Sequence, residues 1–473
     1  MNIRVAVKVL LISALLFAGG APEAVPVERP NVILILADDM GYADIGCFGS
    51  TKNRTPVLDQ MAEEGMRFTS FNTHAVCGPS RAAIMTGCYA MRVAETKNLK
   101  RHHPDIHRDE IMIPGLLKPA GYATAAIGKW DLNGHKKDYK SKVYPSDFGF
   151  DYSYGRLVGS KGRVYENGLV TKSIPYRAST EKYTDQALAF IENYASQPFF
   201  LYLAHAMPHE PVQPGVAFEG KSANGRYGDV IEELDWHIGR IMTRLKELNL
   251  DEKTVVIFCS DNGPWPYWTG PEDSGETGPL RGQKTETWEG GVRTPFIIRA
   301  PGLVPAGRVC NGMIGDIDIL PTLAAFAGVE VPHDRIIDGL NMKPLMTGAV
   351  TESPRKTRYF YYDSHLQAVR YGKWKLILKR PACPPWLHDQ GLGKNFRGRD
   401  VEAVEVPQLY NLEEDLGETE DLAEQYPEVV GRLLTIAAAA RADVGDYNQV
   451  GAGARFYDAT KPQRPDAEKW EDE

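Results

Sequence analysis

The sequence lacks the closely spaced cysteines of a small disulfide-stabilised domain. Its six cysteines are scattered through 473 residues, and no two of them have the spacing of a zinc-binding pair. We therefore expect neither a disulfide-dense scaffold nor a cysteine-ligated zinc ion, although isolated disulfides stay open for an exported chain. The cysteines are Cys47, Cys77, Cys88, Cys259, Cys310 and Cys383.

A concentrated basic region is also missing. The formal net charge is −8, and charged residues of both signs are spread along the chain. Proteins that bind DNA or RNA usually carry a basic stripe, so we expect no nucleic-acid partner. Nothing indicates disorder or internal repeats, and 43% hydrophobic with 25% charged residues is typical of a globular protein with a large core.

The N-terminus has an apolar run too short for a membrane span. Arg4 and Lys8 precede this run at residues 9–18, and small residues follow it up to Ala24. This order is typical of a secretory signal peptide, here residues 1–24. A membrane anchor is the alternative, but a spanning helix needs roughly 20 apolar residues. We expect an exported protein, periplasmic or secreted, without stable membrane insertion.

Strand-like apolar runs recur between residues 25 and 350, and helix-like stretches separate them. The runs are continuous rather than alternating, which suits strands buried on both faces. Amphipathic stretches cover residues 55–65, 179–196 and 229–249. This alternation predicts an α/β domain over residues 25–350, with a large, mixed but mostly parallel central sheet sandwiched by helices. The expected strands are residues 31–37, 122–127, 198–204, 254–260 and 295–299.

The pattern changes near residue 350, which predicts a smaller C-terminal α+β domain over residues 351–473. Short strands are expected at residues 358–362, 367–370 and 374–378, and Tyr371-Gly372 supplies a hairpin turn. Pro427 opens an apolar helix that extends to residue 440. We expect this helix to pack on the antiparallel sheet, and the tail beyond residue 457 to be peripheral.

Polar residues follow several of the predicted strands. The carboxyl ends of parallel strands meet at one edge of an open sheet, and ligands bind there. A single such residue is weak evidence, since Asp-Asn-Gly after a strand is more often a turn. Together, oxygen ligands without a cluster of Cys or His favour Ca²⁺ or Mg²⁺ over zinc. The residues are Asp38, Asp39, Lys129, His205, His209, Asp261 and Asn262.

The segment at residues 77–87 is predicted to be one short helix. Pro79 suits a first helical turn, and Gly87 suits a C-terminal cap. Cys77 would then lie at the positive end of the helix, close to Arg81, where an anion is favoured. A buried structural cysteine is the alternative interpretation.

The same segment resembles the signature of the type I sulfatases, Cys-x-Pro-Ser-Arg followed by Thr-Gly. These formylglycine-dependent enzymes belong to the alkaline phosphatase superfamily, and this chain resembles their arylsulfatases and N-acetylgalactosamine sulfatases. The resemblance extends from residue 31 to about residue 440. Its other motifs are Asp38-Asp39, Gly128-Lys129-Trp130, Pro208-His209, Asp261-Asn262-Gly263, Lys284 with Gly290-Gly291-Val292-Arg293, and Gln408–Asn411 with Leu412 and Gly417-Glu418.

The resemblance implies a sulfuric ester hydrolase in which a maturation enzyme converts Cys77 to formylglycine. It also implies one calcium ion per active site, which binds a sulfate oxygen and offsets charge as the S–O bond breaks. Arg81 is expected to hold the formylglycine, and Lys129 and Lys284 to clamp the sulfate group. The implied calcium ligands are Asp38, Asp39, Asp261, Asn262 and the formylglycine at position 77.

An aldehyde explains the modification chemically. A thiol would form a thiosulfate-like intermediate without an easy exit, whereas an aldehyde hydrate has one hydroxyl to attack sulfur and a second to expel sulfate. We expect His209 to protonate the leaving oxygen, since imidazole titrates near neutral pH. His205 is equally well interpreted as a substrate contact or as a nearby loop residue.

One position departs from the family pattern. The family usually has His two residues after the motif lysine, and this chain has Asp131 there. That His contacts the formylglycine and takes a proton as sulfate is expelled. We hypothesise that Asp131 acts as this base, or that His135 reaches the vacant place; a weakened site is the alternative.

A sulfated carbohydrate is the expected substrate of an exported member of this family. The aromatic run at residues 265–268 follows the predicted calcium residues and suits stacking on sugar rings, although a core cluster explains it nearly as well. His388, Arg397 and Arg399 are weaker candidates for reading anionic sugar groups. A phosphoester or phosphonate hydrolase of the same superfamily and a catalytically silent binder of sulfated glycans stay open as alternatives.

Overall fold

The computed structural model describes residues 29–94, 106–132, 143–157, 163–171, 173–266, 273–380 and 403–455. No helix in these ranges is long and apolar enough to cross a bilayer. The predicted signal peptide, His135, residues 267–268, Cys383, His388, Arg397, Arg399 and the tail beyond residue 457 lie outside these ranges, so the expectations for them stay predictions.

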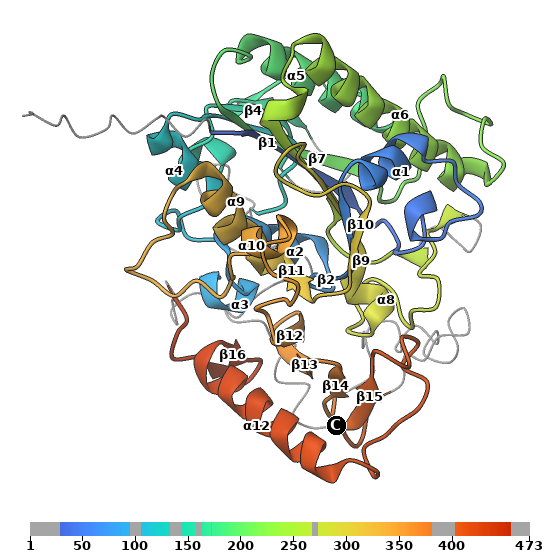
Figure 1. The fold of residues 1–473 in the computed structure, drawn as a ribbon, viewed down its shortest axis with the longest axis vertical. Coiled ribbons are helices and arrows are strands. Elements are labelled where there is room, and N and C mark those ends of the chain that lie inside the picture. Colours follow the sequence, from blue (N-terminus) through green and yellow to red (C-terminus); the bar gives the residue numbers. More distant parts are fainter. Residues whose placement is uncertain are drawn as a thin grey trace, which may run out of the picture.

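One mixed sheet of eleven strands forms the centre of the described chain (Figure 1). Its strands are β1 (Asn31–Asp38), β2 (Met66–Asn72), β3 (Ala123–Lys129), β4 (Tyr152–Arg156), β5 (Val164–Glu166), β6 (Leu169–Val170), β7 (Phe199–Pro208), β8 (Thr254–Ser260), β9 (Arg293–Arg299), β10 (Arg308–Cys310) and β11 (Ile314–Gly315). They lie in the order β10-β2-β9-β8-β1-β7-β3-β4-β5-β6, and β11 also pairs with β2. The strands from β8 to β4 in this order run parallel, which confirms the predicted sheet.

Helices cover both faces of this sheet. On one face the core contains side chains of α1 (Pro56–Glu63), α5 (Ser179–Asn193) and α6 (Gly225–Glu247). On the other face the core contains side chains of α2 (Cys77–Thr86) and α9 (Ile319–Ala327), together with side chains of β1, β7 and β8. Every residue of β1, β7 and β8 is buried, so their apolar runs are continuous, as expected for strands covered on both sides. The shorter helices are α3 (Ala90–Val93), α4 (Ile113–Leu117), α8 (Glu289–Val292) and α10 (Lys343–Met346).

The five predicted strands are confirmed as β1, β3, β7, β8 and β9, with two differences that matter. The predicted strand at residues 295–299 begins at Arg293, and it runs antiparallel to its neighbours β8 and β2. The predicted strand at residues 198–204 continues to Pro208, so His205 lies inside β7 rather than after it. Strands β2, β4, β5, β6, β10 and β11 carry weaker local signals and were not predicted.

A small antiparallel sheet follows in the C-terminal part, drawn in orange and red at the bottom of Figure 1. It consists of β12 (Thr357–Tyr362), β13 (His365–Tyr371), β14 (Trp374–Ile377) and β15 (Gln408–Asn411), in that order. Gly372 has a φ of 57° in the predicted hairpin turn between Tyr371 and Trp374. Helix α12 (Pro427–Asp443) packs on β13 and β14, as expected. The predicted division at residue 350 stays a prediction.

The small sheet also packs against segments that precede α2 and α8. A compact apolar cluster joins Phe360 and Ile377 of the small sheet to Val76, which precedes α2, and to Trp288, which precedes α8. Both α2 and α8 are thus supported from the C-terminal side. A short pair of strands, β16 (Gly445–Asp446) and β17 (Gln449–Val450), completes the described part.

Candidate active site

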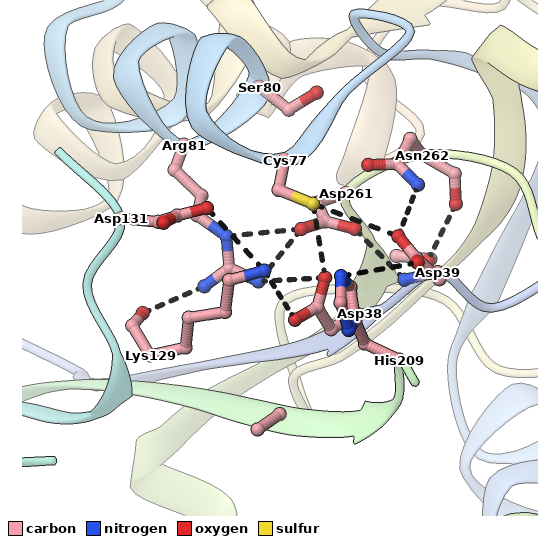
Figure 2. Close-up of polar contacts among 12 residues, drawn as sticks. Asp38, Asp39, Cys77, Ser80, Arg81, Lys129, Asp131, His209, Asp261 and Asn262 are labelled. Atoms are coloured by element: carbon pink, nitrogen blue, oxygen red, sulfur yellow. Dashed lines mark hydrogen bonds and ion pairs between the residues drawn. The ribbon is translucent and has the colours of Figure 1, made fainter. Parts of the chain in front are cut away.

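Cys77 is the first residue of α2 and is buried at the N-terminus of this helix. Its Sγ lies 3.3 Å from Asp38 Oδ1, 3.7 Å from Asp39 Oδ1 and 3.2 Å from Lys284 Nζ. The predicted helix is confirmed, because α2 starts at Cys77 and Gly87 caps it in the left-handed conformation with a φ of 69°. Figure 2 shows the sulfur between the helix and the two aspartates.

Two adjacent parallel strands bring the acidic residues together. Strand β1 pairs with β8 up to Ala37 and Ser260, so Asp38 and Asp39 lie beside Asp261 at the carboxyl end of the sheet. The backbone N–H of Asp39 donates to Asp261 Oδ1 at 3.2 Å. Asp39 has a φ of 67°, an uncommon value for a residue other than glycine, and such strain often accompanies functional sites.

Three buried cations match the three carboxylates. Lys129 Nζ lies 2.7 Å from Asp38 Oδ2, and Lys284 Nζ lies 2.7 Å from Asp39 Oδ1. Arg81 forms the third pair: its Nε and Nη2 donate to one carboxylate oxygen, Oδ2 of Asp261, at 3.0 and 2.7 Å.

Arg81 also donates from Nη1 to the backbone oxygen of Lys129 at 2.7 Å. It thereby ties α2 to the end of β3. The structure therefore brings Arg81 of the predicted helix together with Asp261 and Lys129 at the predicted strand ends.

The charges of the site are strongly coupled. Burial would raise the pKa of Asp38, but Lys129, His209 and Arg81 hold it well below its ordinary value. Burial raises the pKa of the Cys77 thiol, and the neighbouring Asp38 carboxylate adds to this rise. Reactive cysteines usually have a lowered pKa, so this environment does not favour a thiolate nucleophile.

The loop that carries Lys284 is packed without spare room. Lys284 N–H donates to Pro264 O at 3.0 Å, and the next residue, Thr285, has a φ of 72°. A Cβ on Gly291 would lie 2.1 Å from the backbone oxygen of Glu286. The glycines of α8 thus let this loop fold tightly, and the ammonium of Lys284 is aimed at the aspartates.

Glycine is also required where Lys129 enters the site. Gly128 has a φ of 115°, and a Cβ there would lie 1.8 Å from the backbone oxygen of Ala204 in β7. No larger residue fits between these strands.

His209 lies at the edge of this group, half-buried. Its Nδ1 is 2.6 Å from the backbone oxygen of Glu210, which orients the ring, and its Nε2 is 3.8 Å from Asp39 Oδ2. Burial lowers the pKa of His209, and Asp39 offsets only part of this effect. The indole of Trp265 closes the same side, with Lys284 Nζ 4.5 Å from its ring centre and the His209 ring 6.3 Å away.

The structure does not bring His205 into this group. Because His205 lies inside β7, its side chain points to the face covered by α5 and α6, where its ring is 6.5 Å from that of Tyr183. Neither ring nitrogen has a hydrogen-bond partner among the described residues, and burial lowers its pKa to about 3. This position does not support the interpretation of His205 as a substrate contact, which stays a prediction.

Asp131 is buried at the site and has a φ of 62°. Its Oδ2 lies 3.4 Å from Lys129 Nζ, so it acts as a second counterion of this lysine. Burial alone would lower the pKa of Lys129, but Asp131 and Asp38 raise it well above its ordinary value. Figure 2 shows Asp131 on the Arg81 and Lys129 side of the group.

The donor atoms suit a hard cation. Ligand atoms of Asp38, Asp39, Cys77 and His209 all lie within 4.8 Å of one another. Asn262 Oδ1 is buried without a hydrogen-bond partner among the described residues, while its Nδ2 donates to Asp39 Oδ1 at 2.7 Å. Several carboxylate oxygens and a spare amide oxygen form the kind of set that binds Ca²⁺.

Sequence reasoning did not assign a role to three residues behind this site. Glu289, Lys375 and Glu418 are fully buried and form an ion cluster next to the Lys284 loop. The Gly417-Glu418 pair was visible as a motif, but no local pattern indicates which distant residue it contacts.

Family models cover most of the chain. The sulfatase model matches residues 30–329, and the model of the C-terminal region of aryl-sulfatase matches residues 353–463. A model named for the C-terminal part of N-sulphoglucosamine sulphohydrolase matches residues 283–379.

Individual relatives match over nearly their whole length. N-acetylgalactosamine-6-sulfatase of Canis lupus familiaris is 34% identical, with 90% of this chain and 88% of the relative covered. Steryl-sulfatase of Mus musculus is 30% identical, with 91% and 85% covered. A solved structure from work on the metabolism of multiple glycosaminoglycans by Bacteroides thetaiotaomicron is similar with a TM-score of 0.73 at 28% identity, covering 88% of this chain and 99% of that one.

Proposed function

Because this chain belongs to the sulfatase family and is a sulfatase, we propose that it removes sulfate from a sulfated carbohydrate. We further propose that a maturation enzyme converts Cys77 to formylglycine and that one calcium ion binds beside it. The convergence of Asp38, Asp39 and Lys284 on the sulfur of Cys77 carries this proposal. The two aspartates, Cys77 and Lys284 come from three separate segments of the chain, and all of them meet at one buried thiol.

Asp38, Asp39, Asp261 and Asn262 would hold the calcium ion together with residue 77. The spare oxygen of Asn262 and the clustered carboxylates support this ligand set. When present, the ion supplies a Lewis acid for a sulfate oxygen, and formylglycine supplies a hydrated aldehyde as nucleophile.

The residues of the chain itself bind and orient the substrate. Lys129 and Lys284 are compact cations paired with Asp38 and Asp39, and their ammonium groups would also attract the oxygens of the sulfate group. Arg81, held by Asp261 and by Lys129 O, would keep residue 77 in place at the N-terminus of α2.

Proton transfer would involve two residues. His209 would donate a proton from Nε2 to the leaving alcohol oxygen, while its Nδ1 stays bound to Glu210 O. Asp131 would accept a proton during sulfate expulsion, in the place where the family usually has histidine. Its contact with Lys129 supports a position at the site rather than a purely structural role.

A sulfated sugar is the proposed substrate for two reasons. The similar N-acetylgalactosamine-6-sulfatase is named for an amino sugar, and the solved relative comes from work on glycosaminoglycans. In addition, the Trp265 ring borders the site next to His209 and offers an aromatic face of the kind that packs on sugar rings. Export with removal of residues 1–24 agrees with an extracellular or periplasmic glycan.

The test is release of inorganic sulfate by protein produced together with a formylglycine-generating enzyme. We expect release from at least one sulfated saccharide, and much slower hydrolysis of an aryl phosphate than of the matching aryl sulfate. Cys77→Ala should be inactive, whereas Cys310→Ala, which changes a half-buried cysteine on an outer strand, should behave like the wild type. No sulfate release from any saccharide would refute the proposed substrate class.

Mass spectrometry of the tryptic peptide at residues 68–81 tests the modification directly. We expect an aldehyde in place of the thiol at position 77 when the maturation enzyme is present. Active protein with an intact thiol throughout would refute the formylglycine proposal while leaving the sulfatase activity in place.

A further inference from the structure

A buried ion cluster connects the Lys284 loop to the small C-terminal sheet. It consists of Glu289 at the start of α8, Lys375 in β14 and Glu418 after β15, and we call it the Lys375 cluster. Lys375 Nζ lies 2.8 Å from Glu289 Oε1 and 2.9 Å from Glu418 Oε1. The backbone N–H of Glu289 donates to the other oxygen of Glu418, Oε2, at 2.7 Å. One lysine thus joins two carboxylates that are far apart in the sequence.

Nothing in the chemistry of the site requires these three ionisable side chains. Burial raises the pKa of Glu418 to about 7, although Lys375 partly offsets this rise. Each of the three side chains is fully buried, and none of them contacts Cys77 or the aspartates in the described structure. Burial would raise the pKa of Glu289, but Lys375, Arg293 and Arg370 lower it to about 2, so it stays a carboxylate. Removing charged groups from water costs free energy that their pairing often does not recover, so such a cluster is weak evidence for a purely stabilising role.

Further contacts fasten the same loop to the C-terminal part. Arg281 Nη1 donates to Glu418 O at 2.9 Å, and the Arg281 guanidinium lies 3.7 Å from the centre of the Trp288 ring. The Trp288 ring in turn contacts that of Tyr410 in β15, with centres 5.7 Å apart. Glu418 itself has a φ of 51°, so its backbone is held in an uncommon conformation by these surroundings.

The loop transmits the position of α8 to Lys284. A Cβ on Gly291 would lie 2.3 Å from the backbone oxygen of Gln283, the residue before Lys284. With so little room between α8 and the loop, a shift of Glu289 must move the backbone that carries the Lys284 ammonium.

We infer that the Lys375 cluster positions Lys284 for sulfate binding, so that the small C-terminal sheet helps to build the active site. Lys375, Glu289 and Glu418 are positioning residues in this view, because they act through Lys284. The inference rests on the proposed function, in which Lys284 binds the sulfate group.

Glu418→Gln is the first test variant. A glutamine is neutral and has a single side-chain oxygen, so it cannot both pair with Lys375 Nζ and accept the hydrogen bond from Glu289 N–H, as the two carboxylate oxygens do. We expect KM for an aryl sulfate and the inhibition constant of inorganic sulfate to rise together, by about tenfold, with a smaller change in kcat. Lys379→Met, which changes an exposed lysine just after β14, is the control and should leave both unchanged.

A double-mutant cycle separates positioning from general destabilisation. In a Lys284→Ala background, Glu418→Gln should change kcat/KM less than about twofold, because the residue through which it acts is gone. A structural defect would instead reduce activity by the same factor in both backgrounds. Arg281→Met is the second variant for the same cycle, since it releases Glu418 O without leaving a buried charge, and it serves if Glu418→Gln fails to fold.

The two proposals fail in different ways. If the wild type releases no sulfate, the proposed function is refuted. Two results with an active wild type would refute the positioning role. In the first, Glu418→Gln or Arg281→Met has the same KM and sulfate inhibition constant as Lys379→Met. In the second, the substitution reduces kcat/KM by the same factor with and without Lys284.

Discussion

Replacing Arg81 by methionine should destabilise the protein strongly, because it leaves a carboxylate unpaired in the interior. Arg81 and its partner Asp261 are both 0% exposed, and Arg81 gives Asp261 Oδ2 two hydrogen bonds. Because Asp261 is buried, its carboxylate is poorly solvated once the guanidinium is removed. Breaking a buried ion pair by deleting one partner costs about 3–5 kcal/mol. This is a large part of a typical unfolding free energy of about 5–15 kcal/mol.

Arg92→Met is the matched control. Arg92 is also buried, and it lies 2.8 Å from Asp338 and 2.6 Å from Asp443, but the Asp443 side chain is 52% exposed. The Asp443 carboxylate can be hydrated after the substitution, and Asp338, which is 10% exposed, keeps the hydrogen bond from the backbone N–H of Tyr89. We therefore expect a smaller loss, about 1–3 kcal/mol.

Urea unfolding followed by tryptophan fluorescence measures both losses. EDTA should be present, so that no added cation compensates the free carboxylate of Asp261. If Arg92→Met costs as much as Arg81→Met, or if Arg81→Met costs less than about 1 kcal/mol, burial of the partner does not decide the cost.

Four further predictions concern the reaction. The lowered pKa of His209 means that its acid form is lost as pH rises through a value below its ordinary range, so kcat/KM should fall from acidic towards neutral pH. His209→Gln should remove this limb, and a wild-type profile without it would exclude His209 as the acid. Calcium at a hundred times its Kd should add about 2.7 kcal/mol to the free energy of unfolding and so raise the thermal midpoint above that measured in EDTA. Asp39→Asn should abolish this rise, and an unchanged midpoint in the wild type would contradict the metal site. Asp131→Asn should slow sulfate expulsion more than the first step in single-turnover experiments, and unchanged rates would remove it as the base. Trp265→Leu should raise KM several-fold for a sulfated saccharide but not for a small aryl sulfate, and equal effects on both would mean that the ring does not contact the sugar.

Local patterns were sufficient for the central strands and for the helix at Cys77. The runs at residues 32–37 and 255–259 are apolar throughout because helices cover both faces of β1 and β8, and that composition is visible without a structure. The start of α2 and its cap at Gly87 likewise depend on a few neighbouring residues. Both features depend on residues that are close together in the sequence, so local patterns are enough to predict them.

The direction of a side chain at a strand end could not be obtained in this way. Side chains alternate along a strand, so the extension of β7 beyond residue 204 decides that His205 faces the helices, while His209, after the strand, reaches Asp39. The antiparallel direction of β9 also depends on pairing with β2 and β8, which no local pattern encodes.

The sequence by itself determined the fold class, the order of the site motifs and the chemical types that meet there. Carboxylates, an amide and a lysine at strand ends, with a cysteine at a helix start, already indicated an anion and metal site. Only the tertiary structure decided that Lys284 reaches the sulfur of Cys77, that Asp131 contacts Lys129, and that Lys375 joins Glu289 to Glu418. The contacts of Lys284 and Lys375 connect residues that are far apart in the sequence. Their positions along the chain do not indicate how close they lie in space, because only folding brings their segments together.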